Sequence, residues 1–341
     1  MRAAAPPFWG RPPGLVADLL SPIGAACDAA GRLRRAMSRS YRPPVPVVCV
    51  GNLVAGGAGK TPVALALADW LVERGVPAHF VTRGYGGRLR GPMRVDPIRH
   101  DALAVGDEAL LLALRAPCWV ARARSAGVRA AVAAGAGAIL FDDGFQNPTV
   151  DKTLALVVVD AAYGFGNGRV IPAGPLRENL RGGLARADAV VLVAGEGDAS
   201  DTERLLTARG MLTLRAVLAP VGAERLIGSC VLAFAGIGRP EKFFATLRAL
   251  GAVVVGARAF PDHHRFRFAE LEGLRRDAER AGARLITTAK DIVRIPPVRR
   301  IGIEVLEVEI RWADPAALAG LMRPVVLSAQ VNGRHPDEHG R

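Results

Sequence analysis

One short segment near the start of the chain limits its possible folds more than any other. Residues 47–62 read Val-Val-Cys-Val-Gly-Asn-Leu-Val-Ala-Gly-Gly-Ala-Gly-Lys-Thr-Pro, so an apolar strand runs into a glycine-rich turn, and Lys60 and Thr61 then open a helix. In such a turn, successive backbone N–H groups and the helix N-terminus face an anion. The segment therefore predicts a cradle for a nucleoside triphosphate, with Lys60 neutralising phosphate charge and the Thr61 hydroxyl ligating Mg²⁺. The plainer alternative is a tight connection between a strand and a helix.

The turn departs at one position from the usual pattern of this loop, G-x-x-x-x-G-K-[ST]. Val54 stands where the first glycine is expected, and Gly56 and Gly57 supply the flexibility instead. Only four of the 45 basic residues are lysine, so lysine at position 60 indicates a place where a compact ammonium is chemically favoured. The residues expected to surround the nucleotide are Val54, Ala55, Gly56, Gly57, Ala58, Gly59, Lys60 and Thr61.

Length and charge set further limits. The 341 residues are enough for two domains and a sizeable core, which Ala, Val and Leu must form because only 5% of the chain is aromatic. Lys and Arg outnumber Asp and Glu by 45 − 32 = 13, which favours an anionic partner. Because aromatic residues interleaved with basic ones are scarce, we expect a membrane surface rather than nucleic acid. No obligate protein partner is evident from the sequence.

The cysteines indicate a reducing compartment. Cys27, Cys49, Cys118 and Cys230 are scattered without C-x-x-C spacing, and Cys49 and Cys118 fall in expected buried strands. The pattern predicts reduced thiols in a cytosolic protein, with neither a zinc site nor a disulfide framework.

The N-terminal segment 8–35 has the character of a membrane-surface helix. An aromatic pair precedes an apolar stretch at 15–30, and three arginines follow it. Two aspartates and a proline interrupt the stretch, so no segment reaches the ~18–20 apolar residues of a transmembrane helix. We expect a helix that lies in the membrane interface with its arginines toward the headgroups. The alternative is a helix packed on the protein's own core.

From residue 47 to about 220 the pattern alternates strand and helix. The strands are short continuous apolar runs, such as Ala-Ile-Leu-Phe at 138–141, which suits a parallel sheet buried on both faces. A second series of strands and helices begins after 220. The predicted fold is α/β: a P-loop NTPase-type doubly wound, mostly parallel sheet with a second, smaller α/β lobe and an N-terminal membrane-associated helix.

These patterns also predict boundaries for elements and domains. The strands expected in the larger domain are 47–50, 78–82, 118–121, 138–142, 154–160 and 188–193. The elements expected in the smaller lobe are strands at 231–235, 252–257, 284–287 and 303–310, and helices at 240–250, 268–281 and 314–321. The expected domains are an N-terminal membrane-associated segment at 1–42, a P-loop core at 43–225, the smaller lobe at 226–328 and a disordered tail at 329–341.

Acidic residues occur where they would lie close to the predicted cradle. Asp142 and Asp143 follow the strand at 138–141, where a carboxylate beside a P-loop strand would hold Mg²⁺ or its water. Neighbours on a strand point to opposite faces, so we expect one of the two to see the metal directly. Asp107 and Glu108 begin a helix. A strand-ending turn and a helix cap are the respective alternatives.

Other polar motifs fall in loops. Asp262-His263-His264 ends a strand of the second lobe, and because two adjacent histidines rarely make a zinc site, a His–Asp pair for proton transfer is favoured. Residues 287–291 are similar to the guanine-reading motif of GTPases, but no Asn precedes the lysine. The loops at 83–87 and 172–178 carry arginines that would grip a substrate phosphate; surface turns are the alternative.

Together these motifs resemble the tetraacyldisaccharide 4'-kinase family of the lipid A pathway in Gram-negative bacteria. The resemblance covers roughly residues 8–310, and the motifs occur in the family's order. They are Phe8-Trp9, Gly51-Asn52-Leu53, Gly56 to Pro62, Arg83-Gly84-Tyr85-Gly86-Gly87, Gly106-Asp107-Glu108, Asp142 to Gln146, Pro172 to Glu178, Phe234-Ala235-Gly236-Ile237-Gly238 and Asp262-His263-His264. The family's own loop also lacks the first Walker glycine, which accounts for Val54.

The resemblance implies transfer of the ATP γ-phosphate to the 4'-hydroxyl of a tetraacylated glucosamine disaccharide 1-phosphate, at the cytoplasmic face of the inner membrane. It implies that Asp107 and His263 form a proton-accepting pair while Lys60 and Mg²⁺ stabilise charge on the transferring group. Because that pair is expected in two lobes, we expect closure between the lobes to complete the site. The residues implied around Mg²⁺ are Thr61, Glu108, Asp142 and Asp143, and those implied at the lipid substrate are Arg83, Tyr85, Gln146, Arg177 and Glu178.

Two other functions fit part of the pattern. A P-loop switch, whose hydrolysis of nucleotide drives partner binding, would form nucleotide-dependent complexes and make no phosphorylated small product. A non-enzymatic basic protein of the membrane surface would bind anionic vesicles equally well with or without Lys60.

Overall fold

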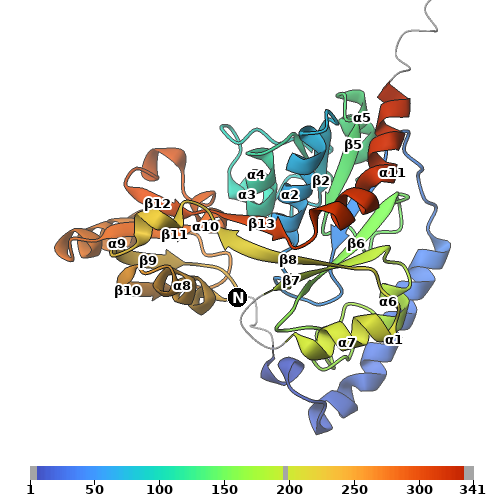
Figure 1. Cartoon of the computed structure of the whole chain (residues 1–341), viewed down its shortest axis with the longest axis horizontal. Coiled ribbons are helices and arrows are strands. Elements are labelled where there is room, and N and C mark those ends of the chain that lie inside the picture. Colours follow the sequence, from blue (N-terminus) through green and yellow to red (C-terminus); the bar gives the residue numbers. More distant parts are fainter. Residues whose placement is uncertain (1–5, 195–198, 334–341) are drawn as a thin grey trace, which may run out of the picture.

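The computed structural model describes residues 6–194 and 199–333, which form two lobes of unequal size (Figure 1). The strands of the larger lobe are β1 (Val47–Gly51), β2 (Ala78–Thr82), β3 (Met93–Arg94), β4 (Cys118–Val120), β5 (Ala138–Asp142), β6 (Leu154–Asp160), β7 (Ala189–Ala194), β8 (Thr213–Pro220) and β13 (Val308–Trp312). They form one nine-stranded sheet in the order β13-β8-β7-β6-β1-β5-β2-β4-β3. Among these strands only β3 and β13 pair antiparallel, so the predicted mostly parallel sheet is confirmed.

The smaller lobe has its own parallel sheet, in the order β10-β9-β11-β12. Its strands are β9 (Cys230–Ala235), β10 (Val253–Ala259), β11 (Arg284–Thr288) and β12 (Ile303–Leu306). Its helical elements are η2 (Ala223–Leu226), α8 (Pro240–Ala249), α9 (Phe268–Arg280), α10 (Ala289–Ile292) and η3 (Pro297–Arg299).

Helices cover both faces of the larger sheet. The helical elements of this lobe are η1 (Pro7–Gly10), α1 (Leu15–Met37), α2 (Lys60–Val72), α3 (Ala102–Val105), α4 (Asp107–Ala113), α5 (Arg124–Ala133), α6 (Leu180–Leu184), α7 (Ser200–Ala208) and α11 (Pro315–Gly333). Val48 and Val50 of β1 belong to the core under α2, α4 and α11, whereas Val47 and Cys49 belong to the core under α5, α6 and α7. Because both sides of the strand are covered, its sequence is continuously apolar.

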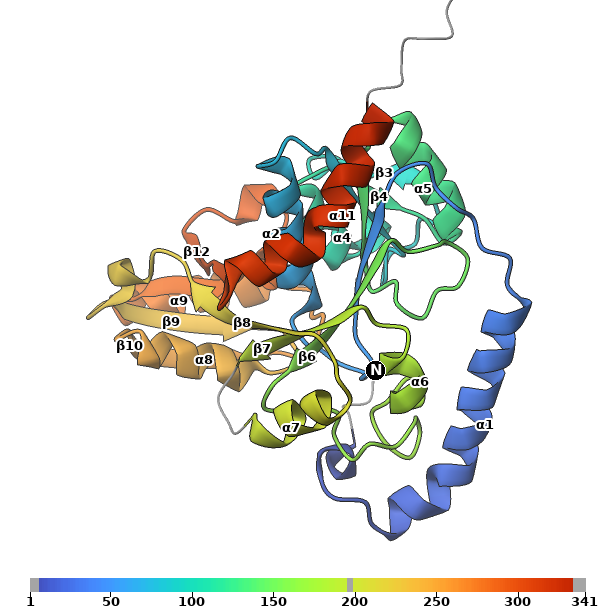
Figure 2. The ribbon, with the colours of Figure 1, turned by 45° about the vertical axis from the view of Figure 1, so that its right-hand side comes forward.

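The C-terminal part of the chain differs from the prediction. The single strand expected at 303–310 is two strands, and the second of them, β13, leaves the smaller lobe to pair with β8. The helix expected at 314–321 extends to Gly333 as α11 and packs on the core of the larger lobe beside α2 (Figure 2). The smaller lobe is therefore an insertion between β8 and β13, and its predicted end at 328 is wrong. The alternation of apolar residues and glutamates at 303–310 does not reveal that the chain changes sheets within this segment.

The expected disordered tail at 329–341 is also wrong in its first part. Residues 329–333 continue α11, and Ala329 is buried against the larger lobe. The remainder of that tail, 334–341, lies outside the described residues.

The N-terminal segment forms α1, which runs along the outer edge of the larger lobe beside α6 (Figure 2). The helix buries mainly small residues, whereas Leu15 is 83% and Leu19 is 79% exposed, with Ile23 on the same face. Within the part of the chain that the structure describes, no helix is long and apolar enough to cross a membrane.

Candidate active site

The glycine-rich turn forms an open cradle at the start of α2. Gly59 caps the helix with φ +83°, and Gly56 has φ +127°, backbone conformations that favour glycine. In the described chain, α2 has no side-chain cap and no acidic residue in its first turn, so the N–H groups there remain open to an anion. Lys60 is the first residue of α2 and lines the cleft between the two lobes.

The first part of this loop is already engaged elsewhere. Val54 is buried in the core and bridges to Leu176, and the Ala55 N–H donates to Pro175 O at 2.7 Å. The stretch that faces the cleft with open backbone is therefore shorter than expected and begins at Gly56. The valine at the first glycine position acts as an anchor that fixes the loop to the segment around residue 175.

Asp142 ends β5 next to the cradle. Its Oδ2 accepts a hydrogen bond from Thr61 Oγ1 at 3.2 Å, and its buried Oδ1 has no hydrogen-bond partner among the described residues. Burial, and then the nearby carboxylate of Glu108, raises the pKa of Asp142. A buried acid with an orphaned oxygen, close to a hydroxyl and a second carboxylate, is a donor set that suits Mg²⁺.

These donors do not amount to a complete metal site by themselves. Across residues 6–194 and 199–333, no three His, Cys, Asp or Glu side chains are grouped so as to hold an ion. Protein-bound Mg²⁺ usually takes one or two carboxylates and completes its shell with water and substrate phosphates. The residues present therefore fit an ion that arrives with a nucleotide.

Asp143 faces a different set of partners from Asp142. It adopts φ +55°, and its Oδ1 lies 2.8 Å from Arg177 Nη1 and 3.6 Å from Lys60 Nζ. Burial opposes its charge, but Lys60 and Arg177 outweigh that effect and lower the pKa of Asp143. The adjacent aspartates therefore have different partners. Asp142 contacts the hydroxyl of Thr61, and Asp143 contacts two cations.

Close backbone packing brings the loop at 83–87 against the start of α4. Gly106 has φ +90°, and a Cβ there would lie 2.4 Å from Tyr85 O. Glycine is therefore required at position 106, and its absence of a side chain places Tyr85 beside Asp107. The Tyr85 ring meets the His263 ring edge-on, with centroids 6.1 Å apart.

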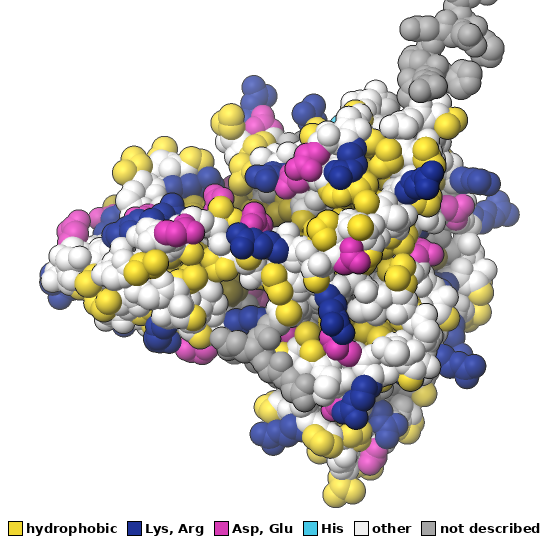
Figure 3. Space-filling view, viewed as in Figure 1, with side chains coloured by type: hydrophobic (Ala, Val, Ile, Leu, Met, Phe, Trp, Pro, Cys, Tyr) yellow, Lys and Arg dark blue, Asp and Glu magenta, His cyan; other side chains and the backbone are white. Residues whose placement is uncertain are grey.

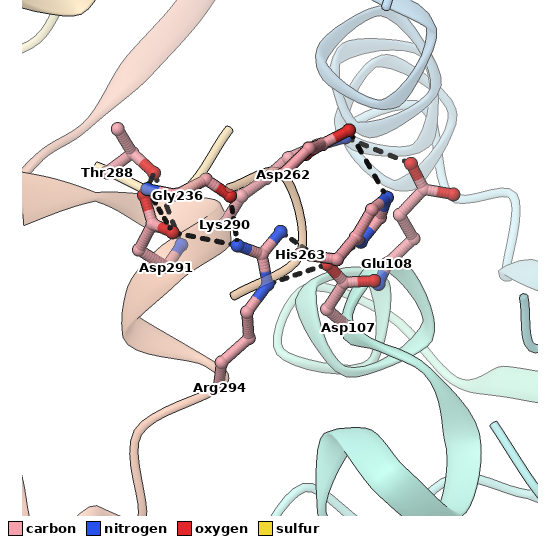
Figure 4. Close-up of polar contacts among 9 residues, drawn as sticks. All are labelled: Asp107, Glu108, Gly236, Asp262, His263, Thr288, Lys290, Asp291 and Arg294. Atoms are coloured by element: carbon pink, nitrogen blue, oxygen red, sulfur yellow. Dashed lines mark hydrogen bonds and ion pairs between the residues drawn. The ribbon is translucent and has the colours of Figure 1, made fainter. Parts of the chain in front are cut away.

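His263 and Asp107 meet across the cleft, as Figure 4 shows. His263 Nδ1 lies 2.8 Å from Asp107 Oδ2. Burial opposes the charge of Asp107, but the hydrogen bond from His263 and the guanidinium of Arg294 outweigh it, so the pKa of Asp107 lies well below its usual range. An ionised Asp107 accepts a hydrogen bond from Nδ1, and in a neutral imidazole bonded in this way Nε2 is the acceptor. Nε2 lies 3.7 Å from Asp262 Oδ2.

Two further cations of the smaller lobe reach the same pair of acidic residues. Lys290 Nζ lies 2.9 Å from Glu108 Oε1, and Arg294 donates to Asp107 from Nε and Nη2 (Figure 4). The sequence drew attention to 287–291 through a partial likeness to a guanine reader, and the family resemblance singled out Lys290 and Asp291 without assigning them a role. It did not reveal Arg294. A signal was present, since two basic residues stand four apart directly after a strand, a spacing that one helical turn brings to the same side. In the structure α10 ends at Ile292, so Arg294 lies just beyond the helix that carries Lys290.

The residues expected at the lipid substrate divide into two groups. Glu178 is only 2% exposed and is paired with Arg35 at 3.2 Å, Arg186 and the amide of Gln146. Its charge is therefore already satisfied inside the protein. Arg177 lines the cleft, as do the exposed side chains of Arg83 and Tyr85 and the half-buried Gln146.

Arg124 is a cleft residue that the sequence did not single out. It begins α5, is buried, and donates from Nη1 to Ala121 O, while its Nε has no partner among the described residues. Burial and then the neighbouring Arg83 lower the pKa of Arg124 to about 10. Two arginines side by side at one wall of the cleft favour an anionic ligand there.

A glycine-rich strand–turn–helix, an acidic residue at the end of the adjoining strand and a doubly wound sheet define a P-loop protein with a second lobe across its cleft. The family model described as tetraacyldisaccharide-1-P 4'-kinase matches residues 16–326. The chain belongs to this family.

Individual relatives agree with the family match over almost the full length. A tetraacyldisaccharide 4'-kinase of Rhodospirillum centenum is 53% identical, with 99% of each chain covered, and one of Paramagnetospirillum magneticum is 52% identical, with 95% of this chain and 99% of the relative covered. Among solved structures, LpxK from Aquifex aeolicus in complex with ATP superposes with a TM-score of 0.74 and 24% identity over 92% of this chain and all of that one. The last similarity supports the fold.

Proposed function

We propose that this protein transfers the γ-phosphate of ATP to the 4'-hydroxyl of a tetraacyldisaccharide 1-phosphate, the step that gives the 1,4'-bisphosphate in lipid A biosynthesis. The observation that carries the proposal is the His263–Asp107 pair, which faces the open N-terminus of α2 across one cleft. A proton acceptor opposite a phosphate cradle is what transfer to a hydroxyl requires. The relatives named for this reaction supply the identity of the acceptor.

The nucleotide would lie with its phosphates on the loop from Gly56 to Thr61. Lys60 would pair with the phosphates. Before they arrive, Asp143 would hold the ammonium of Lys60 in place, and Arg177 would hold the carboxylate of Asp143. Mg²⁺ would be held by Thr61 and Asp142, with Glu108 nearby, and when bound it would neutralise charge on the phosphate oxygens.

The acceptor would be activated by the smaller lobe. Nε2 of His263 would take the proton of the 4'-hydroxyl as that oxygen bonds to the γ-phosphorus and the bond to the β-phosphate oxygen breaks, releasing ADP. Asp107 would keep the imidazole in the correct tautomer and stabilise the imidazolium that forms. Such general-base assistance typically contributes ~10²–10⁴-fold to the rate.

The acyl chains of the acceptor require contact with a lipid surface, and α1 would supply it. Its exposed leucines lie on one face, and the chain has a net charge of +13, which attracts an anionic membrane. Lys and Arg side chains are spread over the face of both lobes drawn in Figure 3 rather than gathered in one patch. These features support contact with an anionic membrane, and we propose that the protein works at the cytoplasmic face of the inner membrane, as the family resemblance implies.

The direct test is incubation of the purified protein with labelled ATP, Mg²⁺ and the acylated disaccharide monophosphate in detergent, followed by identification of the product. The expected product carries the label on the 4'-oxygen. Release of labelled inorganic phosphate without labelled lipid would instead favour a P-loop switch. Absence of both ATP binding and turnover would favour a non-enzymatic membrane-surface protein.

A further inference from the structure

We infer that Arg294 is a positioning residue, which holds the Asp107 carboxylate and the backbone of His263 in one hydrogen-bonded ring so that the imidazole faces the cleft. The inference rests on the proposed function of His263 as the proton acceptor. Neither the sequence motifs nor the comparisons assign a role to Arg294.

The first half of the ring joins Arg294 to Asp107. The arginine side chain is only 3% exposed, and its Nε and Nη2 lie 2.8 and 2.6 Å from Asp107 Oδ2. This is the same oxygen that accepts the hydrogen bond from His263 Nδ1. The other oxygen, Oδ1, accepts from the backbone N–H of Glu108 at 3.0 Å. The carboxylate is therefore held at both oxygens and cannot rotate away from the imidazole without breaking several charge-assisted bonds.

The second half of the ring joins Arg294 to the backbone of His263. Nη1 of the arginine donates to Gly236 O at 2.6 Å, and this carbonyl also accepts from His263 N at 3.0 Å. His263 has φ +59°, a conformation that non-glycine residues adopt only when their surroundings impose it. The shared carbonyl fixes the backbone from which the imidazole projects.

Asp291 completes the arrangement behind the arginine. It is fully buried, and its Oδ1 accepts from Arg294 Nη1 at 2.8 Å and from Gly236 N at 3.0 Å. The backbone N–H of Gly236 thus donates to Asp291, and the carbonyl of Gly236 accepts from Arg294 (Figure 4). Burying three charges is costly, and the geometry here is one that a planar guanidinium satisfies and a single ammonium does not.

The structure also permits a simpler role, in which Arg294 only ties the two lobes together. The two roles differ in what happens when His263 is already lost. A residue that acts through His263 has nothing further to disturb in its absence, whereas a general tether still matters.

The test measures kcat and KM for Arg294→Met and Arg294→Lys, each in the wild-type and in the His263→Gln background. Arg294→Met is expected to lower kcat about 10²-fold, the size of effect that a misplacement of ~1 Å produces, with KM for ATP and lipid nearly unchanged. Arg294→Lys is expected to recover part of that loss. In the His263→Gln background, Arg294→Met is expected to cost no more than about two- to threefold. Arg284→Met is the matched control, because Arg284 pairs with Glu304 in the same lobe and does not line the cleft.

Equal losses of kcat in both backgrounds, or unchanged kcat in Arg294→Met, would overturn the inference. Arg294→Lys keeps a cation in the buried site, so the comparison remains possible if the methionine variant does not fold. A second readout does not depend on activity: the proton on His263 Nδ1, assigned by its loss in His263→Gln, is expected in NMR spectra of the wild type and of Arg284→Met but not of Arg294→Met. Its persistence in Arg294→Met would also overturn the inference. An inactive wild-type protein that shows this NMR pattern would refute the proposed function alone.

Discussion

Lys290 Nζ lies 2.9 Å from Glu108 Oε1, although the two residues are 182 positions apart and belong to different lobes. On the other side of the cradle, Asp160 at the end of β6 meets Arg239 at 3.1 Å and Lys242 at 4.0 Å, both from the smaller lobe. Ion pairs therefore connect the lobes on both sides of the phosphate cradle. Each lobe supplies groups that the other lacks, so the site exists only where the two meet.

The adjacent histidines allow a sharp test of the proton acceptor. His263 pairs across the cleft with Asp107, whereas His264 pairs with Glu270 inside its own lobe. His263→Gln should lower kcat by ~10²–10⁴-fold because glutamine cannot accept the proton, while His264→Gln should stay within about tenfold of the wild type. Steady-state kinetics on both variants provides the measurement. Similar losses in the two variants would argue against His263 as the base.

The hydroxyl of Thr61 separates metal binding from packing. Thr61→Val keeps the shape of the side chain but removes the oxygen that bonds Asp142, whereas Thr61→Ser keeps the oxygen. We expect the valine variant to need more Mg²⁺ and to lose at least about tenfold in kcat, which corresponds to ~1.4 kcal/mol, and the serine variant to behave like the wild type. Titration of activity with Mg²⁺ at saturating ATP tests this. Equal Mg²⁺ dependence in both variants would remove Thr61 from the metal site.

The carboxylate of Asp142 should be required for activity although it lowers the stability of the folded protein when Mg²⁺ and nucleotide are absent. Burial and Glu108 raise the pKa of Asp142, so the folded state binds its proton more tightly than the unfolded chain does. The associated stability is present at low pH and is lost as the pH rises above the ordinary carboxyl value of about 4. Asp142→Asn should therefore raise the free energy of unfolding at neutral pH, by on the order of 1 kcal/mol, while abolishing activity.

Asp143→Asn is the control for that experiment. The pKa of Asp143 is lowered, so its carboxylate stabilises the fold above the unfolded pKa, and the asparagine variant should be less stable at neutral pH. Thermal unfolding without Mg²⁺ or nucleotide, followed from pH 5 to pH 8, measures both effects. Changes of the same sign in the two variants would contradict the assignment of opposite environments to these neighbours.

Arg35 should connect α1 to the loop at 172–178, which is expected to contact the substrate. It lies 3.2 Å from the buried carboxylate of Glu178, which retains Arg186 and Gln146 as partners when Arg35 is removed. Arg35→Ala should therefore cost about 1–3 kcal/mol of stability and raise KM for the lipid more than KM for ATP. Arg32→Ala is the control, since that side chain is 67% exposed and its loss should change stability by less than about 0.5 kcal/mol. Denaturant unfolding measures the change in stability of each variant, and steady-state kinetics measures the change in KM for the lipid and for ATP.

The exposed face of α1 should govern attachment to lipid. Leu19→Asp replaces an exposed leucine whose burial in a bilayer is worth ~1.5–3 kcal/mol, so binding to anionic phospholipid vesicles should weaken at least about tenfold. Val331→Asp changes an equally apolar exposed position in α11 and should leave binding unchanged. Vesicle co-sedimentation measures both. Unaltered binding of Leu19→Asp would mean that α1 is not the attachment surface.

Local chemistry explains which parts of the fold and site were predictable. The cradle depends on neighbours in sequence: glycines at positive φ, an apolar strand before them and a lysine at the first turn of a helix. The continuous apolar runs at 47–50 and 138–141 likewise predict buried parallel strands, because both faces of such a strand are covered. The family resemblance identified Asp107 and His263 as a proton-accepting pair, although their contact depends on the folded structure.

The tertiary structure alone decided how distant segments share partners. In the folded chain β13 and α11 belong to the larger lobe, and the Ala55 N–H donates to Pro175 O. Glu178 is buried beside arginine side chains. It also gathered Arg294 with Asp107 and His263. Sequence patterns report the preferences of a residue and its near neighbours, whereas these contacts depend on where two lobes meet, which is set by packing over the whole molecule.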